Sequence, residues 1–589
     1  MPNRIPYSTI SKLRSVISSS IGKNKPNLVL KNGFVFDVFR GSFFKGDIAV
    51  KDDIIVGIGC EYEGMETVDL DGNFVVPGFI DAHIHIESSF LTPKSFEQAV
   101  LPLGTTSLIW DPHEIANVKG VSGIEWALKA SEGLTLDFFL TVPSCVPSTS
   151  PGLGLETSAH LLDSKSLKKF RTHKRVVGLA ELMNYPGLLS MENDLLNKIL
   201  TFRSLTLDGH CPNLLGKELN AYAAARINTC HESTELKEAE EKLKRGIHIL
   251  VREGSCASDL ENLLPLINEY SSANIALCSD DRNPIDIQRE GHINHIINKA
   301  LSKGVPAEII FRCASHSTAN IYNLKDRGAI APGYIADLVV VKQRNKGSWK
   351  NGFDVVNVYK KGKKIDPSNF REAARSRRKP PKNIHFNRIT PNQLGFDMRA
   401  TEGQRVKVIV IRERSLLTDS SLEYLETANG RWLPDVSRDI LKVTVFERHK
   451  GTNAHSSAFV RGFGLKEGAI ASSINHDSHN VIAVGVSDEA ITSAINILCK
   501  INGGIVVTDG LGRTETLVLP IGGLMTDDHY LTVVENLKRL HGLSRQLGCR
   551  IKDPFIQLSF LALPVLPKLR ITDKGLVDVE QFKIVPIGE

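Results

Sequence analysis

The sequence predicts an α/β protein built on a central (β/α)8 TIM barrel, with a small β domain assembled from both flanks and a C-terminal α/β domain. Three observations predict it. Between residues 77 and 325, β-like runs alternate with helical runs; short β runs lie on both sides of this region; and a new alternation begins after a basic, proline-containing stretch. The eight candidate barrel strands are Phe74–His85, Thr105–Asp111, Asp137–Val142, Val176–Leu182, Leu205–His210, Ile227–His231, His248–Arg252 and Ile275–Asp280.

Helical spacing of apolar residues separates these strands, as a barrel requires. The clearest helical stretches are Leu195–Phe202, Leu219–Arg226, Leu236–Leu243 and Leu260–Ile267. The expected domains are an N-terminal extension (1–26), a small β domain (27–76 with 326–370), the barrel (77–325), a basic linker (371–389) and a C-terminal domain (390–589).

Composition indicates a globular protein. The chain has 589 residues, of which 42% are hydrophobic and 23% charged, with a net charge of +6. We expect no transmembrane helix, because no run of about 18 apolar residues occurs. The nine cysteines contain no C-x-x-C pair, which favours reduced thiols and a cytoplasmic location.

Two basic segments could be misread. Residues 1–36 contain no acidic side chain, as in transit peptides, but an ordinary extension is the preferred interpretation. The cluster from Arg375 to Lys382 lacks aromatic residues and includes Pro380 and Pro381. We therefore interpret it as a solvated linker and expect no nucleic-acid partner.

The first candidate strand carries two histidines, His83 and His85, separated by one residue. Side chains at positions i and i+2 lie on one face of a strand, so both imidazoles can converge on one point. Neutral imidazole is a common ligand of zinc, manganese and iron. The alternative, two histidines on a solvent-facing strand, fits poorly with the apolar residues around them.

Four more strand ends carry metal-ligand residue types: Glu181, His210, His231 and Asp280. Active sites of such barrels lie at the carboxyl ends of the strands. With the first pair, this makes four histidines and two carboxylates, enough for two adjacent cations. Each residue alone could be a core histidine, a salt-bridge partner or a helix cap; their coincidence favours a metal site. The neighbouring Cys211 and Cys230 are interpreted as small buried hydrophobes.

With these residues placed, the sequence resembles the metal-dependent amidohydrolases and, within them, the bacterial-type adenine deaminases. The resemblance covers nearly the whole chain. It is carried by PGFIDAHIHIESS (77–89), DPHEIANV (111–118), GLAELMNYPG (178–187), LDGHCP (207–212), CHES (230–233), REGS (252–255), SDDRNP (279–284), DRGAIAPGYIADLVVV (326–341) and HDSHN (476–480). Most related hydrolases place a carboxylated lysine on the fourth strand, whereas this chain has Glu181, as in adenine deaminases.

The resemblance implies hydrolytic deamination of adenine to hypoxanthine. It also implies that the metal ligands are His83, His85, Glu181, His210, His231 and Asp280. Manganese is the family's usual cofactor. The nitrogen and oxygen ligand set alone leaves manganese, iron(II) and zinc open.

The reaction needs a carboxylate that moves a proton from water to the ring or leaving amine. Asp280 is the first choice, with one oxygen on metal and the other free. Glu232 and Asp281 are weaker candidates, because strict strand alternation directs them away from the pocket. Glu114 could recognise the purine edge, relay protons, or only cap a helix.

Other pocket roles are less sharply defined by the sequence. His113 and Arg252 are expected to line the pocket and bind substrate. The segment 476–479 could close over the substrate, or be an ordinary surface loop.

Two rival functions stay open at this point. One is an amidohydrolase acting on a different amino-purine or a cyclic amide. The other is an inactive amidohydrolase scaffold, which would be expected to lack ligands that this chain retains. We also expect a homo-oligomer, most simply a dimer, and no membrane partner.

Overall fold

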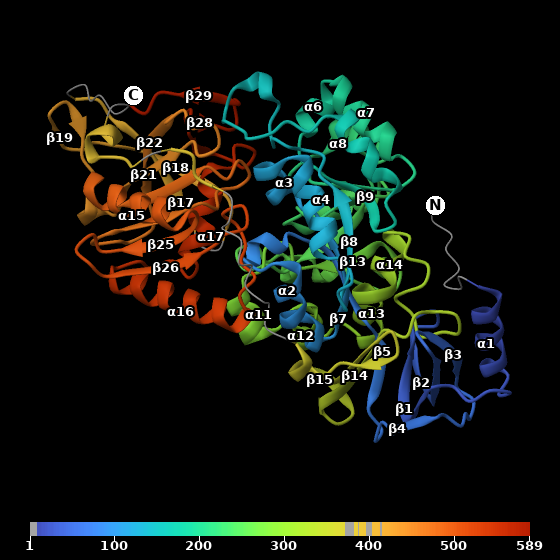
Figure 1. Cartoon of the computed structure of the whole chain (residues 1–589). Coiled ribbons are helices and arrows are strands. Elements are labelled where there is room, and N and C mark those ends of the chain that lie inside the picture. Colours follow the sequence, from blue (N-terminus) through green and yellow to red (C-terminus); the bar gives the residue numbers. More distant parts are fainter. Residues whose placement is uncertain (1–8, 371–381, 387, 396–402, 413–414) are drawn as a thin grey trace.

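The computed structural model describes residues 9–370, 382–386, 388–395, 403–412 and 415–589. Figure 1 shows a central barrel, a small sheet beside the N-terminal helix α1 (Ile10–Ser20), and a C-terminal body of strands and helices on the other side. The N- and C-terminal regions therefore lie at opposite ends of the molecule, with the barrel between them.

Each of the eight predicted barrel strands has a counterpart. They are β6 (Phe79–Ile84), β7 (Thr105–Trp110), β8 (Asp137–Val142), β9 (Val176–Leu182), β10 (Thr206–Gly209), β11 (Thr229–Cys230), β12 (His248–Arg252) and β13 (Ile275–Cys278). β6 to β10 form one sheet and β11 to β13 another. Asn228 N donates to Leu207 O at 2.7 Å across one junction, and Asp280 N donates to His83 O at 3.0 Å across the other. The strands therefore close into a ring.

The predicted first strand, Phe74–His85, is two strands in the structure. β5 (Phe74–Pro77) belongs to the small sheet, and β6 begins after Gly78. A Cβ atom at Gly78 would collide with the side chain of Thr106, so only glycine allows the chain to pass so close to β7. The chain therefore changes sheets just before it reaches His83 and His85.

Helices surround the strands, as the alternating pattern predicts. Those of the barrel region are α2 (Pro93–Val100), α3 (His113–Lys119), α4 (Val121–Ala130), α5 (Ser164–Leu167), α6 (Tyr185–Leu189), α7 (Asn193–Phe202), α8 (Gly216–Ala224), α9 (Leu236–Leu243), α10 (Leu260–Leu263), α11 (Pro284–Glu290), α12 (Ile293–Ser302), α13 (Ala307–Arg312) and α14 (Thr318–Ile321). Inside the ring, a buried cluster that includes Ile80, Ile109 and Tyr322 fills the barrel. This packed interior is the floor beneath the strand ends.

The small sheet uses strands from both sides of the barrel sequence. Its strands are β1 (Leu28–Asp37), β2 (Ser42–Lys51), β3 (Ile54–Ile58), β4 (Glu66–Asp69), β5, β14 (Leu338–Asn345), β15 (Ser348–Lys360) and β16 (Lys363–Lys364). β14 pairs antiparallel with β5, which joins the two flanks.

The C-terminal body is built on an eight-stranded mixed sheet. Its strands, in spatial order, are β18 (Thr418–Glu423), β17 (Val406–Ile411), β22 (His455–Arg461), β21 (Ile440–Phe446), β24 (Val481–Gly485), β23 (Ala469–Ser472), β25 (Gly504–Thr508) and β26 (Thr514–Val518). The accompanying helices are α15 (Asp488–Ile501), α16 (Tyr530–Gln546) and α17 (Pro554–Ser559). Shorter strands are β19 (Thr427–Ala428), β20 (Arg431–Trp432), β27 (Leu569–Thr572), β28 (Gly575–Asp578) and β29 (Lys583–Val585).

The C-terminal body is hydrogen-bonded directly to the barrel region. Thr526 N donates to Phe90 O at 2.9 Å, and Thr92 N donates back to Thr526 O at 3.2 Å. A second contact joins Asp573 to Thr157, whose backbone N–H donates at 2.9 Å and whose hydroxyl donates at 2.5 Å. The C-terminal body is thus fixed against the barrel at two separate places.

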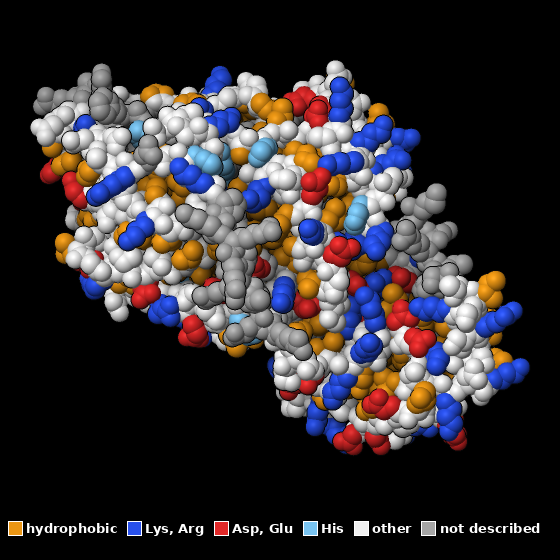
Figure 2. Space-filling view, viewed as in Figure 1, with side chains coloured by type: hydrophobic (Ala, Val, Ile, Leu, Met, Phe, Trp, Pro, Cys, Tyr) orange, Lys and Arg blue, Asp and Glu red, His pale blue; other side chains and the backbone are white. Residues whose placement is uncertain are grey.

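The visible surface carries mixed charge. Figure 2 shows Lys and Arg side chains interspersed with Asp and Glu across this face. Of the basic cluster from Arg375 to Lys382, residues 375–381 lie outside the described residues. None of the described helices is long and apolar enough to cross a membrane.

Candidate active site

His83 and His85 converge at the end of β6, as their spacing predicts. Their Nε2 atoms lie 3.1 Å apart, and both side chains are buried. His83 Nδ1 faces Asp208 Oδ2 at 3.0 Å, and His85 Nδ1 faces the backbone oxygen of Asp111 at 3.0 Å. Both Nδ1 atoms are therefore donors, which leaves a lone pair on each Nε2 of the neutral rings. Two lone pairs directed at one point fit a cation.

Glu181, in β9, places one carboxylate oxygen beside each pair of histidines. Oε1 lies 3.2 Å from His85 Nε2 and 3.8 Å from His83 Nε2. Oε2 lies 2.7 Å from His210 Nδ1 and 3.4 Å from His231 Nε2. The carboxylate thus spans two adjacent groups of ligand-type atoms, the position of a bridging ligand between two cations.

Asp280 follows β13 and faces the first histidine pair. Its Oδ1 lies 3.3 Å from His85 Nε2 and 3.7 Å from His83 Nε2. Its backbone is left-handed, with φ of 53°, which turns the chain sharply at the strand end. The expected free second oxygen is not free, because Oδ2 accepts a hydrogen bond from Arg252 Nη1 at 3.0 Å.

Arg252 lies behind the cavity rather than on its wall. It is buried and also donates to Asp259 Oδ2 at 2.9 Å and to Glu232. It is not among the residues that line the cavity described below. The geometry therefore differs from the expected substrate contact and favours a positioning role for Arg252.

Glu232 and Asp281 both face the cavity, contrary to strand alternation. The physical reason is that β11 ends at Cys230 and β13 at Cys278, so neither residue obeys the strand's period. Glu232 Oε1 lies 3.5 Å from His231 Nε2. Asp281 accepts a hydrogen bond from the hydroxyl of Ser88.

Electrostatics hold the central carboxylates ionised. Burial alone would raise the pKa of Glu181, but His231 and the hydrogen bond from His210 lower it well below its usual value. The pKa of Asp280 is also well below its usual value: burial opposes ionisation, and the neighbouring His85, His231 and Arg252 side chains outweigh it. Burial would lower the pKa of His231, yet Glu181 raises it to about 9. The site therefore attracts positive charge.

His113 and Glu114 begin α3 and extend the site toward the C-terminal body. His113 Nδ1 lies 2.9 Å from Asp111 Oδ2 and 3.3 Å from Glu181 Oε1. Glu114 contacts His476 and His479, which lie between β24 and the preceding strand β23. The segment 476–479, for which an ordinary surface loop was the default expectation, thus reaches the site.

A further group of metal-ligand residue types consists of Glu114, His476 and His479. Its hydrogen bonding instead favours a structural contact between α3 and the C-terminal body. Asn475 N donates to His479 Nδ1 at 3.3 Å, so the proton of the neutral ring lies on Nε2, facing Glu114. Burial would lower the pKa of His476, but Glu114 raises it to about 9. Both rings therefore donate to the carboxylate, which joins α3 to the C-terminal body.

These side chains enclose a small cavity of about 30 Å³, room for little more than one water. It is lined by His85, His113, Glu114, Glu181, Met183, His210, His231, Glu232, Asp280, Asp281, Leu416, His476, Asp477, Phe560, Leu563 and Leu566. The barrel supplies the polar wall. The C-terminal body supplies the apolar leucines and Phe560, whose ring stacks on His476 at 4.3 Å between centroids.

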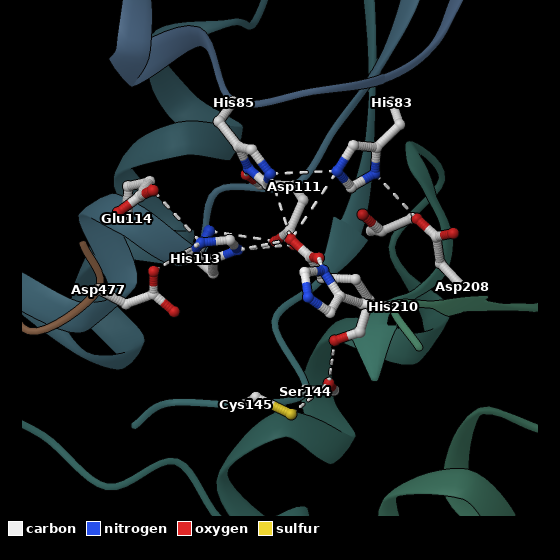
Figure 3. A network of polar contacts seen from close by, with 12 residues as sticks. His83, His85, Asp111, His113, Glu114, Ser144, Cys145, Asp208, His210 and Asp477 are labelled. Atoms are coloured by element: carbon white, nitrogen blue, oxygen red, sulfur yellow. Dashed lines mark hydrogen bonds and ion pairs between the residues drawn. The ribbon is translucent and has the colours of Figure 1, made fainter. Parts of the chain in front are cut away.

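Three carboxylates at the site were not among the site residues expected from the sequence: Asp111, Asp208 and Asp477. Figure 3 shows Asp208 behind His83 on one side, and Asp477 directed at His113 on the other. Asp208 follows β10's Leu207 and could have been suspected from its place two residues before His210. Asp477, whose Oδ1 lies 3.9 Å from His113 Nε2, belongs to the segment 476–479, which the sequence marked only as a possible closing loop and not as a source of a carboxylate at the site.

Known sequences are similar to this chain over nearly its full length. An adenine deaminase of Sinorhizobium fredii is 42% identical over 576 residues, covering 97% of this chain and 99% of that one. Adenine deaminase 2 of Carboxydothermus hydrogenoformans is 41% identical over 583 residues, covering 98% of this chain and 99% of that one. This chain belongs to the adenine deaminase family.

Two family models match separate parts of this chain. The amidohydrolase family model matches residues 74–365, and the adenine deaminase C-terminal domain model matches residues 415–583. A crystal structure of an adenine deaminase aligns over 58% of this chain and 100% of that one, with 16% identity and a TM-score of 0.44. Family membership and the buried histidine and carboxylate groups together indicate a metal site.

Proposed function

We propose that this chain hydrolyses adenine to hypoxanthine and ammonia, with a pair of divalent metal ions held at the strand ends of the barrel. The observation that carries the proposal is the carboxylate of Glu181, which lies between the two histidine pairs. Manganese is the proposed metal, with iron(II) or zinc as alternatives compatible with a nitrogen and oxygen ligand set.

The proposed ligands are His83, His85, Glu181, His210, His231 and Asp280. The fit is supported by the unprotonated Nε2 atoms of His83 and His85, and by His210 Nδ1 and His231 Nε2, which lie 2.7 and 3.4 Å from Glu181 Oε2. When bound, the metal pair would lower the pKa of a water and make it nucleophilic near neutral pH.

The protein's own groups then move protons. In the overall reaction, a bond forms between C6 of adenine and the water oxygen, and the bond from C6 to the exocyclic nitrogen breaks. One water proton ends on ring N1, and the other leaves with ammonia. Asp280 is the proposed base, because its Oδ1 faces the histidines while Arg252 holds its Oδ2.

The neighbouring groups are assigned supporting roles. Glu232 and Asp281 line the same cavity and can relay protons or contact substrate. His113 is close enough to Glu181 to orient it, and Glu114 holds the segment 476–479 over the cavity. Arg252 is proposed to position Asp280 and Glu232.

The test is a deamination assay on protein loaded with manganese. Ammonia and hypoxanthine should form from adenine, but not from cytosine, guanine or adenosine. Release of ammonia from a different amino-purine or a cyclic amide in place of adenine would favour the rival amidohydrolase. Protein that binds no metal and turns over none of these compounds would favour the inactive scaffold.

Location and assembly stay predictions. All nine cysteines are free in the structure, which supports a reducing compartment such as the cytoplasm. The expected homodimer can be checked by sedimentation of the metal-loaded protein.

A further inference from the structure

One carboxylate of the cavity has an unused acceptor. Asp477 is 2% exposed, and its Oδ2 has no hydrogen-bond partner. Among the cavity-lining carboxylates of the described chain, it alone has a buried oxygen in this state. Burying a carboxylate oxygen without a donor is costly, so native proteins retain such an atom only where a ligand or solvent supplies one.

The other carboxylates already have partners. Both oxygens of Glu114 face histidines, and Glu232 and Asp280 share Arg252. Asp281 is held by Ser88. Asp477 is therefore the acceptor with most capacity to receive a hydrogen bond from a molecule in the cavity.

The surroundings of Asp477 suit a flat heterocycle. Asp477 and the apolar side chains of Phe560, Leu563 and Leu566 form the wall that the C-terminal body contributes, whereas the proposed metal ligands that line the cavity come from the barrel. Figure 3 places Asp477 on the side of the site away from His83 and Asp208. A purine with C6 at the metal ligands would have its other edge directed toward this wall.

We infer that Asp477 accepts a hydrogen bond from a ring N–H on the five-membered ring of a free purine base, and so selects the base over its nucleoside. A free base has a hydrogen on N7 or N9. A nucleoside is substituted at N9 and lacks this hydrogen in its neutral form. The inference rests on the proposed function, since it assumes that a purine occupies the cavity.

The test is a cycle between enzyme variants and substrate analogues, using the full-length, manganese-loaded protein. Wild type and Asp477→Asn are assayed with adenine, 7-deazaadenine, which keeps only N9–H, and 9-deazaadenine, which keeps only N7–H. The matched control is Asp419→Asn, a partly exposed aspartate of β18 in the C-terminal sheet that pairs with Arg412.

Loss of a charged hydrogen bond should reduce kcat/KM of Asp477→Asn for adenine on the order of 10- to 100-fold. With the deaza analogue that lacks the recognised N–H, Asp477→Asn should reduce kcat/KM only slightly. With the analogue that keeps this N–H, it should reduce kcat/KM by the same factor as with adenine. Asp419→Asn should behave as wild type with all three.

Equal losses with adenine and both analogues would overturn the inference, because they would show a general role in folding or proton transfer. Unchanged activity of Asp477→Asn toward adenine would also overturn it. Failure of the wild type itself to deaminate adenine would instead contradict the proposed function, so the two failures are distinguishable.

Discussion

Nε2 of His83 lies 3.1 Å from Nε2 of His85, although each neutral ring donates its hydrogen from Nδ1. No hydrogen is then available to join the two nitrogens, and their lone pairs repel. Glu181 and Asp280 add two more acceptor atoms within 4 Å. A cation is the occupant that resolves this arrangement.

Removing and restoring metal should change both stability and stoichiometry. Protein treated with chelator should melt at a lower temperature, and manganese should raise the melting temperature again, because it binds the folded state. Metal analysis should give about two equivalents per chain. His85→Ala should retain about one, whereas His173→Ala, at the opposite end of the barrel, should retain both. Equal metal content in the two variants would contradict the assignment.

Replacing the proposed base should stop chemistry without unfolding the protein. Asp280→Asn keeps the side chain's size but removes its ability to accept a proton, so kcat should fall about 10²- to 10⁴-fold. Circular dichroism and metal content should be compared with wild type. A variant that retains metal and near wild-type kcat would exclude Asp280 as the base.

Arg252 should control the acid limb of the pH profile. Its positive charge lowers the pKa of Glu232, against the effect of burial. Removing the charge in Arg252→Met raises the pKa of the carboxylates, so they become protonated, and activity is lost, at higher pH than in wild type. The matched control is Arg282→Met, which removes another buried arginine that pairs with Glu290 and the backbone. Both variants should be less stable than wild type. Only Arg252→Met should move the acid limb of the pH–activity profile to higher pH.

The contact between Asp573 and Thr157 should support activity from outside the cavity. Asp573 Oδ1 also accepts a hydrogen bond from Asn480 Nδ2 at 3.3 Å, next to the segment that reaches Glu114. Asp573→Ala should therefore loosen this segment and reduce kcat/KM for adenine roughly 10-fold, which corresponds to the free energy of about one such hydrogen bond. The control is Asp578→Ala, because the Asp578 side chain accepts hydrogen bonds from Glu580 and Gln581 within its own turn. Identical kinetics of both variants would mean that the contact is only structural.

Glu156 should make stability depend on pH. Burial, with Asp477 nearby, raises its pKa from 4.5 to about 8. A folded-state pKa above the unfolded value means that the group's stabilisation is complete below pH 4.5 and is lost as the pH rises toward 8. The side chain in Glu156→Gln stays neutral at every pH. The melting temperature of this variant, relative to that of wild type, should therefore rise between pH 5 and pH 8.5. A constant difference across this range would show that Glu156 has an ordinary pKa.

Local patterns were sufficient for the barrel and for most of the ligand set. The two-residue spacing of His83 and His85 and the position of Glu181 at a strand end each follow from the period of a β-strand and the barrel's geometry. The division of the first strand at Gly78 did not follow, because it depends on the approach of Thr106 from the next strand.

Contacts between distant segments were the part that sequence periodicity did not reach. Glu232 and Asp281 point into the cavity because their strands end two or three residues earlier than the alternation assumes. Asp477 faces His113 across an interface between two bodies of the protein. Its position depends on how those bodies dock, and docking depends on surface complementarity that a single sequence does not display.

The cavity of about 30 Å³ has a consequence for turnover. In this state the cavity is smaller than a purine, and it is lined partly by the barrel and partly by the C-terminal body. On the proposed function, these two bodies would have to move apart for the base to enter and for hypoxanthine to leave. Such a domain motion is slowed by solvent friction. If the domain motion is slower than the chemical step, kcat should fall as sucrose raises the viscosity of the medium. The rate-limiting step would then be movement at the interface between the barrel and the C-terminal body, and not the chemical step.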